Sequence, residues 1–474
     1  MEKEIVHIHQ VVTRLPELRF AEPVEWRICE GEQWAVVGPN GAGKTLLADI
    51  LQRKFAFREG EVCYNKEGKV SDIIRSIAFK DIYSLADCRN SYYQQRWHAT
   101  ESETLSAYEG TENLKEVLHI FGIEDLLPKK LIYLSSGELR IFLIVRTLLS
   151  RPEILILDNP FIGLDAPSRD LLVDMLGQLS YLHGVQVILL LSNPADIPDM
   201  ITHVLPIAGK KCYPPMSRKA FLADTALIQV LFPEENWIQT VLPVDPNKQP
   251  ATHEVTFRME HVCIRYGKRT ILKDLDWEVK NGEKWALFGP NGAGKSTLLS
   301  LVYADNPQSY ANTLYLFDKK RGSGESIWEI KKRIGYVSPE MHLYYMENVP
   351  TLHIVGSGYF DSIGLFRKCN DEQNAGALKW MQVFGIDHLK DRPFLTLSSG
   401  EQRLALLARA FVKDPDLIIL DEPLHGLDVS NKKRAAAIIE QFCSRPGKTL
   451  IYVTHYPHEL PTCVKQTFQL VKHL

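Results

Sequence analysis

The sequence of 474 residues predicts an α/β fold made of two related domains in tandem. Two glycine-rich segments carry this prediction, GPNGAGKT at Gly38–Thr45 and GPNGAGKS at Gly289–Ser296, which lie 251 residues apart. Each follows a short apolar run that reads as a buried strand, Gln33–Val37 or Lys284–Phe288, and each precedes a stretch that reads as helix. A strand, glycine turn and helix that occur twice in this order favour two α/β domains over an ordinary glycine turn.

Both glycine-rich segments fit the pattern G-x-x-x-x-G-K-[ST], which binds the phosphates of nucleotides. Glycines let the backbone wrap an anion with its N–H groups, and the positive end of the following helix adds to the attraction. We expect Lys44 and Lys295 to reach the outer phosphates, and Thr45 and Ser296 to give a hydroxyl to Mg²⁺. The sequence therefore predicts two sites for a nucleoside triphosphate with Mg²⁺ as cofactor.

Composition excludes several classes of function. A hydrophobic content of 45% and a charged content of 24% are those of a soluble globular protein, and a net charge of −3 makes a nucleic-acid partner unlikely. Two local basic clusters, Lys331–Arg333 and Asn431–Arg434, are interpreted as solvated helix faces. The eight cysteines form no C-x-x-C pair, which disfavours zinc and iron–sulfur sites and fits reduced thiols in the cytosol.

No segment predicts secretion or membrane insertion. The start, Met1–Glu4, is charged and has no signal-peptide core, and the longest apolar runs, Ile154–Leu157 and Val185–Leu191, have the length of buried strands. We therefore expect a cytoplasmic protein. If it serves a membrane, it does so peripherally, on the inner face of the cell membrane through a partner.

The internal repeat extends beyond the phosphate loops. The pentapeptide LSSGE occurs at Leu134–Glu138 and again at Leu397–Glu401. In both halves an apolar run follows and ends in an aspartate, Asp158 or Asp421, at the same spacing from the pentapeptide. A Gly-Leu-Asp tripeptide then follows in each half. An isolated LSSGE could be a helix N-cap with no ligand, but that interpretation does not explain why both copies keep one spacing.

In this order the motifs resemble those of the ABC ATPase family, over nearly the whole chain, and LSSGE resembles the family's signature motif LSGGQ. The resemblance implies two head-to-tail cassettes, each with a RecA-like core and a helical subdomain. We expect the first cassette at residues 1–235 and the second at 253–474. The linker at 236–252 contains prolines that favour an extended path. The helical subdomains are expected near 95–150 and 325–410.

The resemblance also implies that each ATP lies between the phosphate loop of one cassette and the signature motif of the other. Tyr266 occupies the position where the family stacks an aromatic ring on adenine, whereas the first cassette has Leu15 there, with Phe20 as a substitute. The expected Mg²⁺ ligands are Thr45, Asp158, Ser296 and Asp421. The expected ATP-binding residues are Gly38, Pro39, Asn40, Gly41, Ala42, Gly43, Lys44, Thr45, Ser135, Ser136, Gly137, Glu138, Tyr266, Gly289, Pro290, Asn291, Gly292, Ala293, Gly294, Lys295, Ser296, Thr297, Ser398, Ser399, Gly400 and Glu401.

The two sites are not expected to be equal catalysts. Hydrolysis needs a group that orients or deprotonates water, which in this family is a glutamate directly after the aspartate. The second cassette has Glu422 there, but the first has Asn159, which cannot accept a proton. The family's switch histidine corresponds to His455 in the second cassette and to Ser192 in the first. The expected catalytic residues are therefore Glu422 and His455, and loss of a base costs about 10²–10⁴ in rate.

One family feature, a glutamine, is not found in both halves. Many members carry a glutamine between the phosphate loop and the helical subdomain that contacts Mg²⁺ and the attacking water. The first cassette offers Gln94 and Gln95, whereas the second has no glutamine in the matching stretch and offers only Glu340.

Two hypotheses of function remain open. The segments Gly324–Ser338 and Ser357–Gly364 resemble the molybdenum-transport group of tandem-cassette proteins, which implies a transport ATPase that docks on a separate membrane subunit. The alternative is a soluble ATPase switch that acts on a macromolecule such as the ribosome or DNA. The short proline-bearing linker, Asn159 and the near-neutral charge favour transport.

Overall fold

The computed structural model describes residues 3–472 except 67, 79–123, 125–135, 163, 165, 234–240, 245–247, 249–250, 268, 291, 340, 342–344, 346–347 and 363–366. The chain divides into two compact units, residues 1–235 with 428–430 and residues 236–427 with 431–474. Most of the first predicted helical subdomain, near 95–150, lies outside the described residues.

The first unit contains a mostly parallel sheet with the strand order β10-β8-β3-β7-β6-β5, and β9 pairs with β8. Because β3, β6 and β7 are interior strands, they are apolar and nearly fully buried. The strands are β3 (Trp34–Val37), β5 (Ile74–Ala78), β6 (Ile154–Asp158), β7 (Gln186–Leu191), β8 (His203–Ala208), β9 (Lys211–Cys212) and β10 (Met216–Ser217).

Successive residues of these strands face opposite layers of the unit. Leu155 and Leu157 of β6 join a core cluster with residues of α5 and α6, whereas Ile154 and Ile156 join one with α1 and the antiparallel sheet β2-β1-β4. The remaining elements of this unit are β1 (Glu4–Thr13), β2 (Val24–Cys29), α1 (Lys44–Leu51), β4 (Phe57–Tyr64), α2 (Val70–Ile73), α5 (Ser136–Leu148), α6 (Ala166–His183), α7 (Arg218–Ala223) and α8 (Thr225–Leu231).

The second unit repeats the same plan. Its parallel sheet has the order β16-β17-β18-β13-β19, which corresponds strand by strand to β5-β6-β7-β3-β8 of the first unit. An antiparallel sheet, β12-β11-β14-β15, lies beside it. The strands are β11 (Val255–Tyr266), β12 (Arg269–Lys280), β13 (Lys284–Phe288), β14 (Thr313–Leu316), β15 (Lys319–Lys320), β16 (Ile334–Val337), β17 (Leu417–Asp421), β18 (Thr449–Val453) and β19 (Gln466–Gln469).

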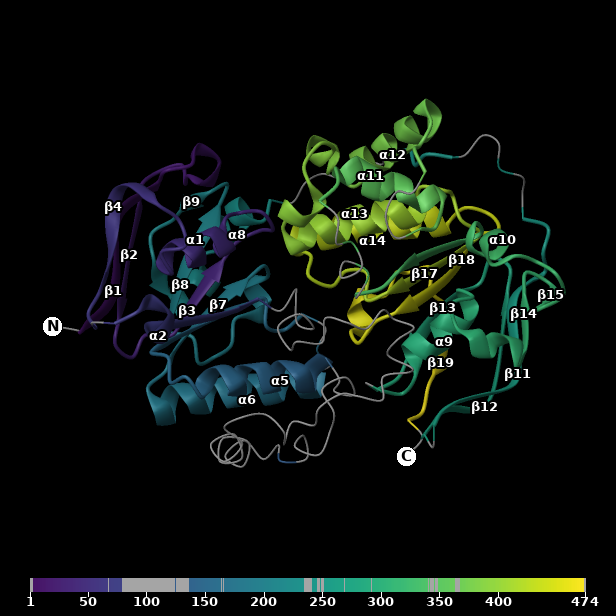
Figure 1. Cartoon of the computed structure of the whole chain (residues 1–474), viewed down its shortest axis with the longest axis horizontal. Helices are drawn as coiled ribbons and strands as arrows, with labels where there is room; N and C mark the ends of the chain where they lie inside the picture. Colours follow the sequence, from purple (N-terminus) through teal and green to yellow (C-terminus); the bar gives the residue numbers. More distant parts are fainter. Residues whose placement is uncertain are drawn as a thin grey trace. The chain divides into compact units, whose positions relative to one another are not determined.

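Helices cover one face of this second sheet. Figure 1 shows α11, α12, α13 and α14 gathered on one side of β17 and β18, with α9 and the antiparallel sheet on the other. The helices are α9 (Lys295–Val302), α10 (Ile327–Lys331), α11 (Thr351–Gly356), α12 (Asp371–Val383), α13 (Ser399–Phe411) and α14 (Val429–Cys443). The predicted helical region 325–410 was too long at its start, because β16 lies within it and pairs with β17 in the main sheet.

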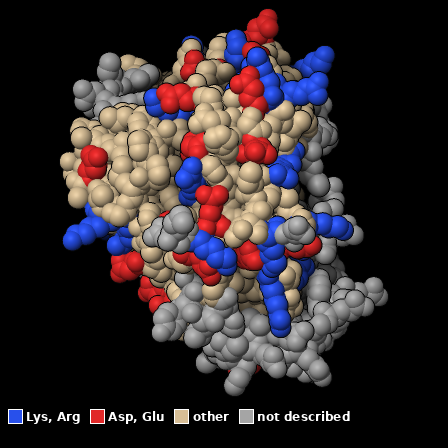
Figure 2. Space-filling model, turned by 90° about the vertical axis from the view of Figure 1, so that its left-hand side faces the viewer, with Lys and Arg blue, Asp and Glu red and all other residues tan. Residues whose placement is uncertain are grey.

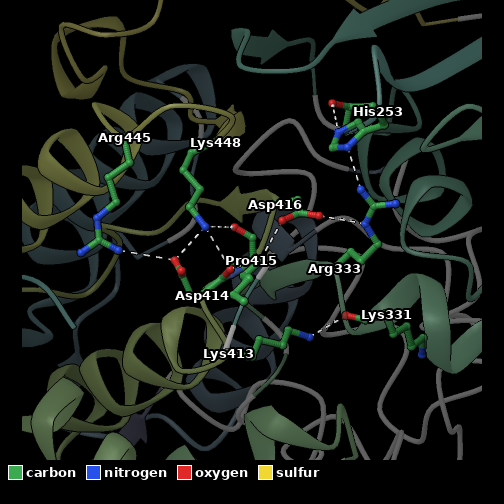
Figure 3. A network of polar contacts seen from close by, with 11 residues as sticks. His253, Lys331, Arg333, Lys413, Asp414, Pro415, Asp416, Arg445 and Lys448 are labelled. Carbon is green, nitrogen blue, oxygen red and sulfur yellow. Dashed lines mark hydrogen bonds and ion pairs between the residues drawn. The ribbon is translucent and has the colours of Figure 1, made fainter. Parts of the chain in front are cut away.

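The basic cluster Lys331–Arg333 is not a solvated helix face, contrary to the sequence-based interpretation. The Lys331 side chain is only 11% exposed and forms an ion pair with Asp305. Arg333 Nε donates to Asp416 Oδ2 at 2.8 Å, within the network of polar contacts in Figure 3. Lys331 is thus buried and Arg333 is paired although 34% exposed, whereas Lys332 between them is exposed, a difference that a run of charges in a sequence cannot reveal.

The described part of the predicted linker packs on the second unit. Leu242 is 2% exposed, and Arg445 donates to the backbone oxygens of Leu242 and Pro243 at 2.7 and 3.1 Å. Lys248 Nζ lies 2.6 Å from Asp416 Oδ1. The end of the linker is therefore fixed to the loop that precedes β17.

Candidate functional site

The two phosphate loops leave their sheets at matching points, after β3 and after β13. Gly43 and Gly294 form the N-caps of α1 and α9 with φ of 108° and 98°, a left-handed conformation that glycine adopts without strain. Neither helix has a side-chain cap at this end. The N–H groups of the first turn therefore stay available for a bound anion.

The loop lysines fold back over their loops. Lys44 Nζ donates to the oxygens of Gly38 and Pro39 at 2.7 and 2.8 Å, and Lys295 Nζ donates to Gly289 O at 2.6 Å. Burial lowers the pKa of Lys44 to about 8, although the nearby Asp158 carboxylate opposes this shift. A phosphate placed in the loop would give these lysines a strong, charged hydrogen-bond acceptor.

In the first unit the polar residues at the carboxyl ends of β6 and β7 form one hydrogen-bonded chain. Thr45 Oγ1 donates to Asp158 Oδ2 at 2.7 Å, and Asn159 Nδ2 donates to Asp158 Oδ1 at 2.8 Å. Ser192 Oγ lies 3.0 Å from Asn40 Oδ1 and 3.4 Å from Asn159 Oδ1. Thr45 and Asp158 offer oxygen ligands of the kind that Mg²⁺ prefers. The Asn159 amide and the Ser192 hydroxyl, however, cannot act as a general base.

In the second unit the matching position holds a buried carboxyl group. The Glu422 N–H donates to Val453 O at 2.9 Å, which places this residue between the ends of β17 and β18. Glu422 is 7% exposed, its Oε1 has no hydrogen-bond partner among the described residues, and His455 Nε2 lies 3.7 Å from it. Burial, together with Asp421 and Glu459, raises the pKa of Glu422 to about 8. A carboxyl group with a raised pKa in such a place can exchange a proton with water near neutral pH.

The backbone is the same at the two positions although the side chains differ. Asn159 has a φ of 51° and Glu422 a φ of 50°, both in the left-handed region. Asparagine tolerates this region well, whereas for glutamate it costs about 1–2 kcal/mol. Strain that persists in a native structure is concentrated at functional sites, so Glu422 stands out for its conformation as well as its burial.

Arg403 of α13 supports this loop, and the sequence reasoning missed it. Its guanidinium donates to the oxygens of Ser338, Asp421 and Pro423 at 2.7, 2.8 and 3.3 Å, and also to Glu422 O. Burial lowers the pKa of Arg403 to about 10, while Asp421 and Glu422 oppose the shift.

The first unit has a counterpart of this arginine. Arg140 Nη1 donates to Pro160 O at 2.9 Å from the same position of α5. The signal was present in the sequence, because both signature segments continue with an arginine two residues after their glutamate.

The second signature motif opens α13 with a capping box. Ser398 Oγ accepts from the Glu401 N–H at 3.3 Å, and Glu401 Oε2 accepts from the Ser398 N–H at 2.7 Å. This cap accounts for both residues without a ligand, so their part in ATP binding stays a prediction. In the first unit α5 begins at Ser136, and Ser135 lies outside the described residues.

The aromatic residues near the loops differ between the units. Tyr266 ends β11, where its Oη accepts from Asn306 Nδ2 at 3.0 Å. Leu15 is 50% exposed. Phe20 packs close to Gly43 of the loop, because a Cβ atom built on Gly43 would lie only 3.3 Å from the Phe20 ring. Phe20 therefore lies beside the first phosphate loop.

Some predicted residues are not placed. Asn291, Gln94, Gln95 and Glu340 lie outside the described residues, as do the side chains of Ser136 and its neighbours at the start of α5.

Comparison with known proteins agrees with this geometry. The family model described as ABC transporter matches residues 21–162 and 272–425. The chain is 34% identical to the ABC transporter ATP-binding protein ModF of Escherichia coli, over 98% of this chain and 96% of that protein. It is 30% identical to an uncharacterised ABC transporter ATP-binding protein of Schizosaccharomyces pombe, over 94% and 93% of the two chains.

Solved structures show the same fold at lower sequence identity. An archaeal ribosome recycling factor, solved with a ribosomal stalk protein, covers 97% of this chain and 87% of its own, with a TM-score of 0.53 at 18% identity. The chain belongs to the ABC ATPase family, as a tandem-cassette ATP-binding protein and an ATPase. Within the described part of the chain, no helix has the length and apolar character that crossing a membrane requires.

Proposed function

We propose that the second nucleotide site hydrolyses ATP and that the first binds ATP with little or no turnover. One observation carries the proposal. Two residues have the same backbone conformation at matching places, Glu422 directly after β17 in one cassette and Asn159 directly after β6 in the other. Glu422 is buried next to His455, whereas Asn159 is hydrogen-bonded to Asp158 and cannot accept a proton.

We assign the following roles at the second site. Lys295 and the loop N–H groups bind the phosphates, and Glu422 orients and deprotonates the attacking water. We assign His455, whose Nε2 lies 3.7 Å from Glu422 Oε1, to contact the terminal phosphate and to orient Glu422. Ser296 and Asp421 would hold Mg²⁺, as Thr45 and Asp158 would at the first site. Bound Mg²⁺ would neutralise the charge that develops on the phosphates.

We further propose that ATP joins the two cassettes, residues 1–235 and 253–474, with 236–252 as the linker. Each signature motif would contact the ATP held by the phosphate loop of the other cassette. The hydrolytic site would then use the signature of the first cassette, at Leu134–Glu138.

The decisive comparison is Glu422→Gln against Asn159→Gln, two substitutions at matching positions. We expect Glu422→Gln to lower the ATPase rate by about 10²-fold or more, because the base is lost while ATP binding remains. Asn159→Gln should keep the rate within a few-fold of the parent protein. The assignment is wrong if Glu422→Gln turns over like the parent, or if Asn159→Gln is the substitution that abolishes turnover.

For the process that ATP drives, we propose transport through a separate membrane subunit, related to molybdate. The supporting facts are the full-length similarity to ModF, which bears the name of an ABC transporter ATP-binding protein, and the mixed surface charge. Figure 2 shows basic and acidic side chains interspersed on the face that it presents, without a gathering of one sign that would suit a nucleic acid. The protein would then work in the cytoplasm, at the inner face of the membrane.

Cell fractionation tests this proposal. The Glu422→Gln protein, expressed in its own host with ATP present, should sediment with membranes and retain a membrane protein on purification. Salt-sensitive sedimentation with ribosomes, or retention of DNA, would instead support a macromolecular switch and rule out the transport assignment.

A further inference from the structure

The antiparallel sheet of the first cassette carries a cluster of imidazole and carboxylate groups that is separate from the residues of the phosphate loop. His7 and His9 lie on β1 and Glu25 lies on β2. Residues two apart on a strand face the same side, and Ile8 between the two histidines is fully buried. Both imidazoles therefore point to the solvent side, where His7, His9 and Glu25 have side chains that are 14%, 57% and 38% exposed.

The three side chains converge on one point. His7 Nε2 lies 2.6 Å from Glu25 Oε1, and His9 Nδ1 lies 3.3 Å from Glu25 Oε2. One potential ligand atom from each of the three lies within 4.8 Å of the others. Such spacing is close to what three ligands need around a single ion with metal–ligand distances near 2.0–2.2 Å.

Neighbouring groups hold the cluster in place. The β1–β2 register shifts after Ile8, and Gln10 takes a φ of 46° there. As a result, the Gln10 backbone N–H and side-chain Nε2 both donate to Glu25 Oε2 at 3.1 Å. Glu4 Oε1 lies 3.8 Å from His7 Nδ1, the ring nitrogen that faces away from Glu25. A carboxylate behind a histidine is the usual support of a metal-bound imidazole.

The second cassette shows that the fold does not require this cluster. Offset by the repeat length, His7 and His9 correspond to Arg258 and Glu260, which form an ion pair with an N–O distance of 3.0 Å. Arg258 also lies 3.8 Å from Glu278 on β12. On this sheet face the second cassette therefore has the ion pairs of Arg258 where the first has two imidazoles, and Asp276, the counterpart of Glu25, lies 3.8 Å from the single imidazole of His261.

We propose that His7, His9 and Glu25 bind one divalent transition-metal ion of the Zn²⁺ class, separate from the Mg²⁺ of the nucleotide sites. Two imidazoles and one carboxylate suit Zn²⁺, Co²⁺ or Ni²⁺ better than Mg²⁺, which prefers oxygen ligands alone. The open coordination positions go to water.

One neighbouring charge opposes the ion. Arg27 Nε lies 3.3 Å from His7 Nε2 and competes for that nitrogen. Its guanidinium must move aside when the ion binds, and its positive charge weakens binding. Arg27→Gln should therefore raise the affinity for the metal ion. A His–Glu contact with a purely structural role would not show this effect.

The test is a Zn²⁺ titration of the full chain without nucleotide, with millimolar Mg²⁺, a non-thiol reductant and a chromophoric chelator as competitor. We expect each chain to take one Zn²⁺ ion from the chelator. The Zn²⁺ affinity should fall about 10-fold or more in His9→Ala and in Glu25→Gln, and it should rise in Arg27→Gln. ATPase activity of each variant in Mg²⁺ alone should match the parent, which shows that the fold is intact.

The second cassette supplies the matched control. His261, Asp274 and Asp276 form an exposed group with only one imidazole, so His261→Ala should leave Zn²⁺ affinity unchanged. The proposal is overturned if His9→Ala binds Zn²⁺ like the parent, if His261→Ala removes the binding, or if no ion competes with the chelator.

Discussion

Glu422 and Asn159 show how a single side chain separates two sites that share one backbone. The left-handed φ at both positions follows from the chain turning after β17 or β6, so each site keeps the geometry whichever residue it holds. Glutamate keeps the strain and offers a carboxylate that can accept a proton, whereas asparagine tolerates this conformation and cannot accept one. Sequence comparison of the two halves was enough to find this difference. The burial of Glu422 and its 3.7 Å separation from His455 required the structure.

Arg403 should position Glu422 without contacting the nucleotide. Arg403→Lys leaves several buried carbonyl oxygens without donors, because a lysine cannot reach four of them. We expect kcat to fall about 10-fold with the apparent KM for ATP little changed, and a loss of about 1–3 kcal/mol in stability. Steady-state kinetics and thermal unfolding measure the two effects.

The matched control is Arg140→Lys at the first site. It should lower the stability but leave kcat close to the parent value. A fall in kcat in Arg140→Lys as large as that in Arg403→Lys would contradict the asymmetry of the sites.

At the scale of single elements, the start of α13 joins local sequence to the site. Ser398 and Glu401 form a capping box that any Ser-x-x-Glu sequence could make, and this local signal sets the first residue of the helix. The helix then projects Arg403 onto the loop after β17. The start of the helix thus depends on residues that are close in the sequence, whereas the contact partner of Arg403, 18 residues away in the chain, came only from packing.

Loss of the cap should cost stability in the absence of nucleotide. Ser398→Ala removes the acceptor for the Glu401 N–H, which costs about 0.5–2 kcal/mol, whereas Ser398→Gly should cost only a few tenths. For a unit of this size, 1 kcal/mol corresponds to about 2–4 °C in Tm. Equal Tm values for the alanine and parent proteins, measured by calorimetry, would show that the capping box contributes nothing.

The loop before β17 gives a prediction about pH. Burial alone would raise the pKa of Asp416, but the ion pairs with Lys248 and Arg333 outweigh burial and lower it. A carboxyl group with a lowered pKa in the folded state adds stability above its unfolded pKa of about 3.9 and loses it as the pH falls through the folded value. The Tm difference between the parent and Asp416→Asn should therefore be full at pH 6 and shrink below about pH 4. A difference that grows on acidification would contradict these pairings.

At the scale of the whole molecule, the chain is a duplication. Its halves share a strand order but carry different polar and charged side chains at matching positions. The orders β5-β6-β7-β3-β8 and β16-β17-β18-β13-β19 are the same, and the family model matches both halves. Within this common frame, single side chains differ at matching positions: Asn159 for Glu422, Ser192 for His455, and the imidazoles of β1 for the ion pairs of β11. Duplication thus provides an internal control for every functional assignment.

Unequal sites predict unequal effects of the loop lysines. Lys295→Ala should lower the ATPase rate by about 10²-fold or more, because it removes charge stabilisation at the hydrolytic site. Lys44→Ala should leave the rate within about 10-fold and reduce the number of ATP molecules retained per chain in a Glu422→Gln background from two to one. Measured rates and equilibrium dialysis test both statements. Equal losses of rate in the two variants would mean that the sites hydrolyse ATP alike.

The sequence by itself determined the duplication, the family, both phosphate loops and the replacement of glutamate by asparagine after Asp158, because these depend on residue identity at fixed local spacing. Tertiary structure decided what depends on long-range packing. It brought Arg403 to the loop after β17, showed that Lys331 and Arg333 form ion pairs with Asp305 and Asp416, and placed β16 in the main sheet. It also brought Glu25 to His7 and His9, because a strand pattern tells which side a residue faces but not what the neighbouring strand sets beside it.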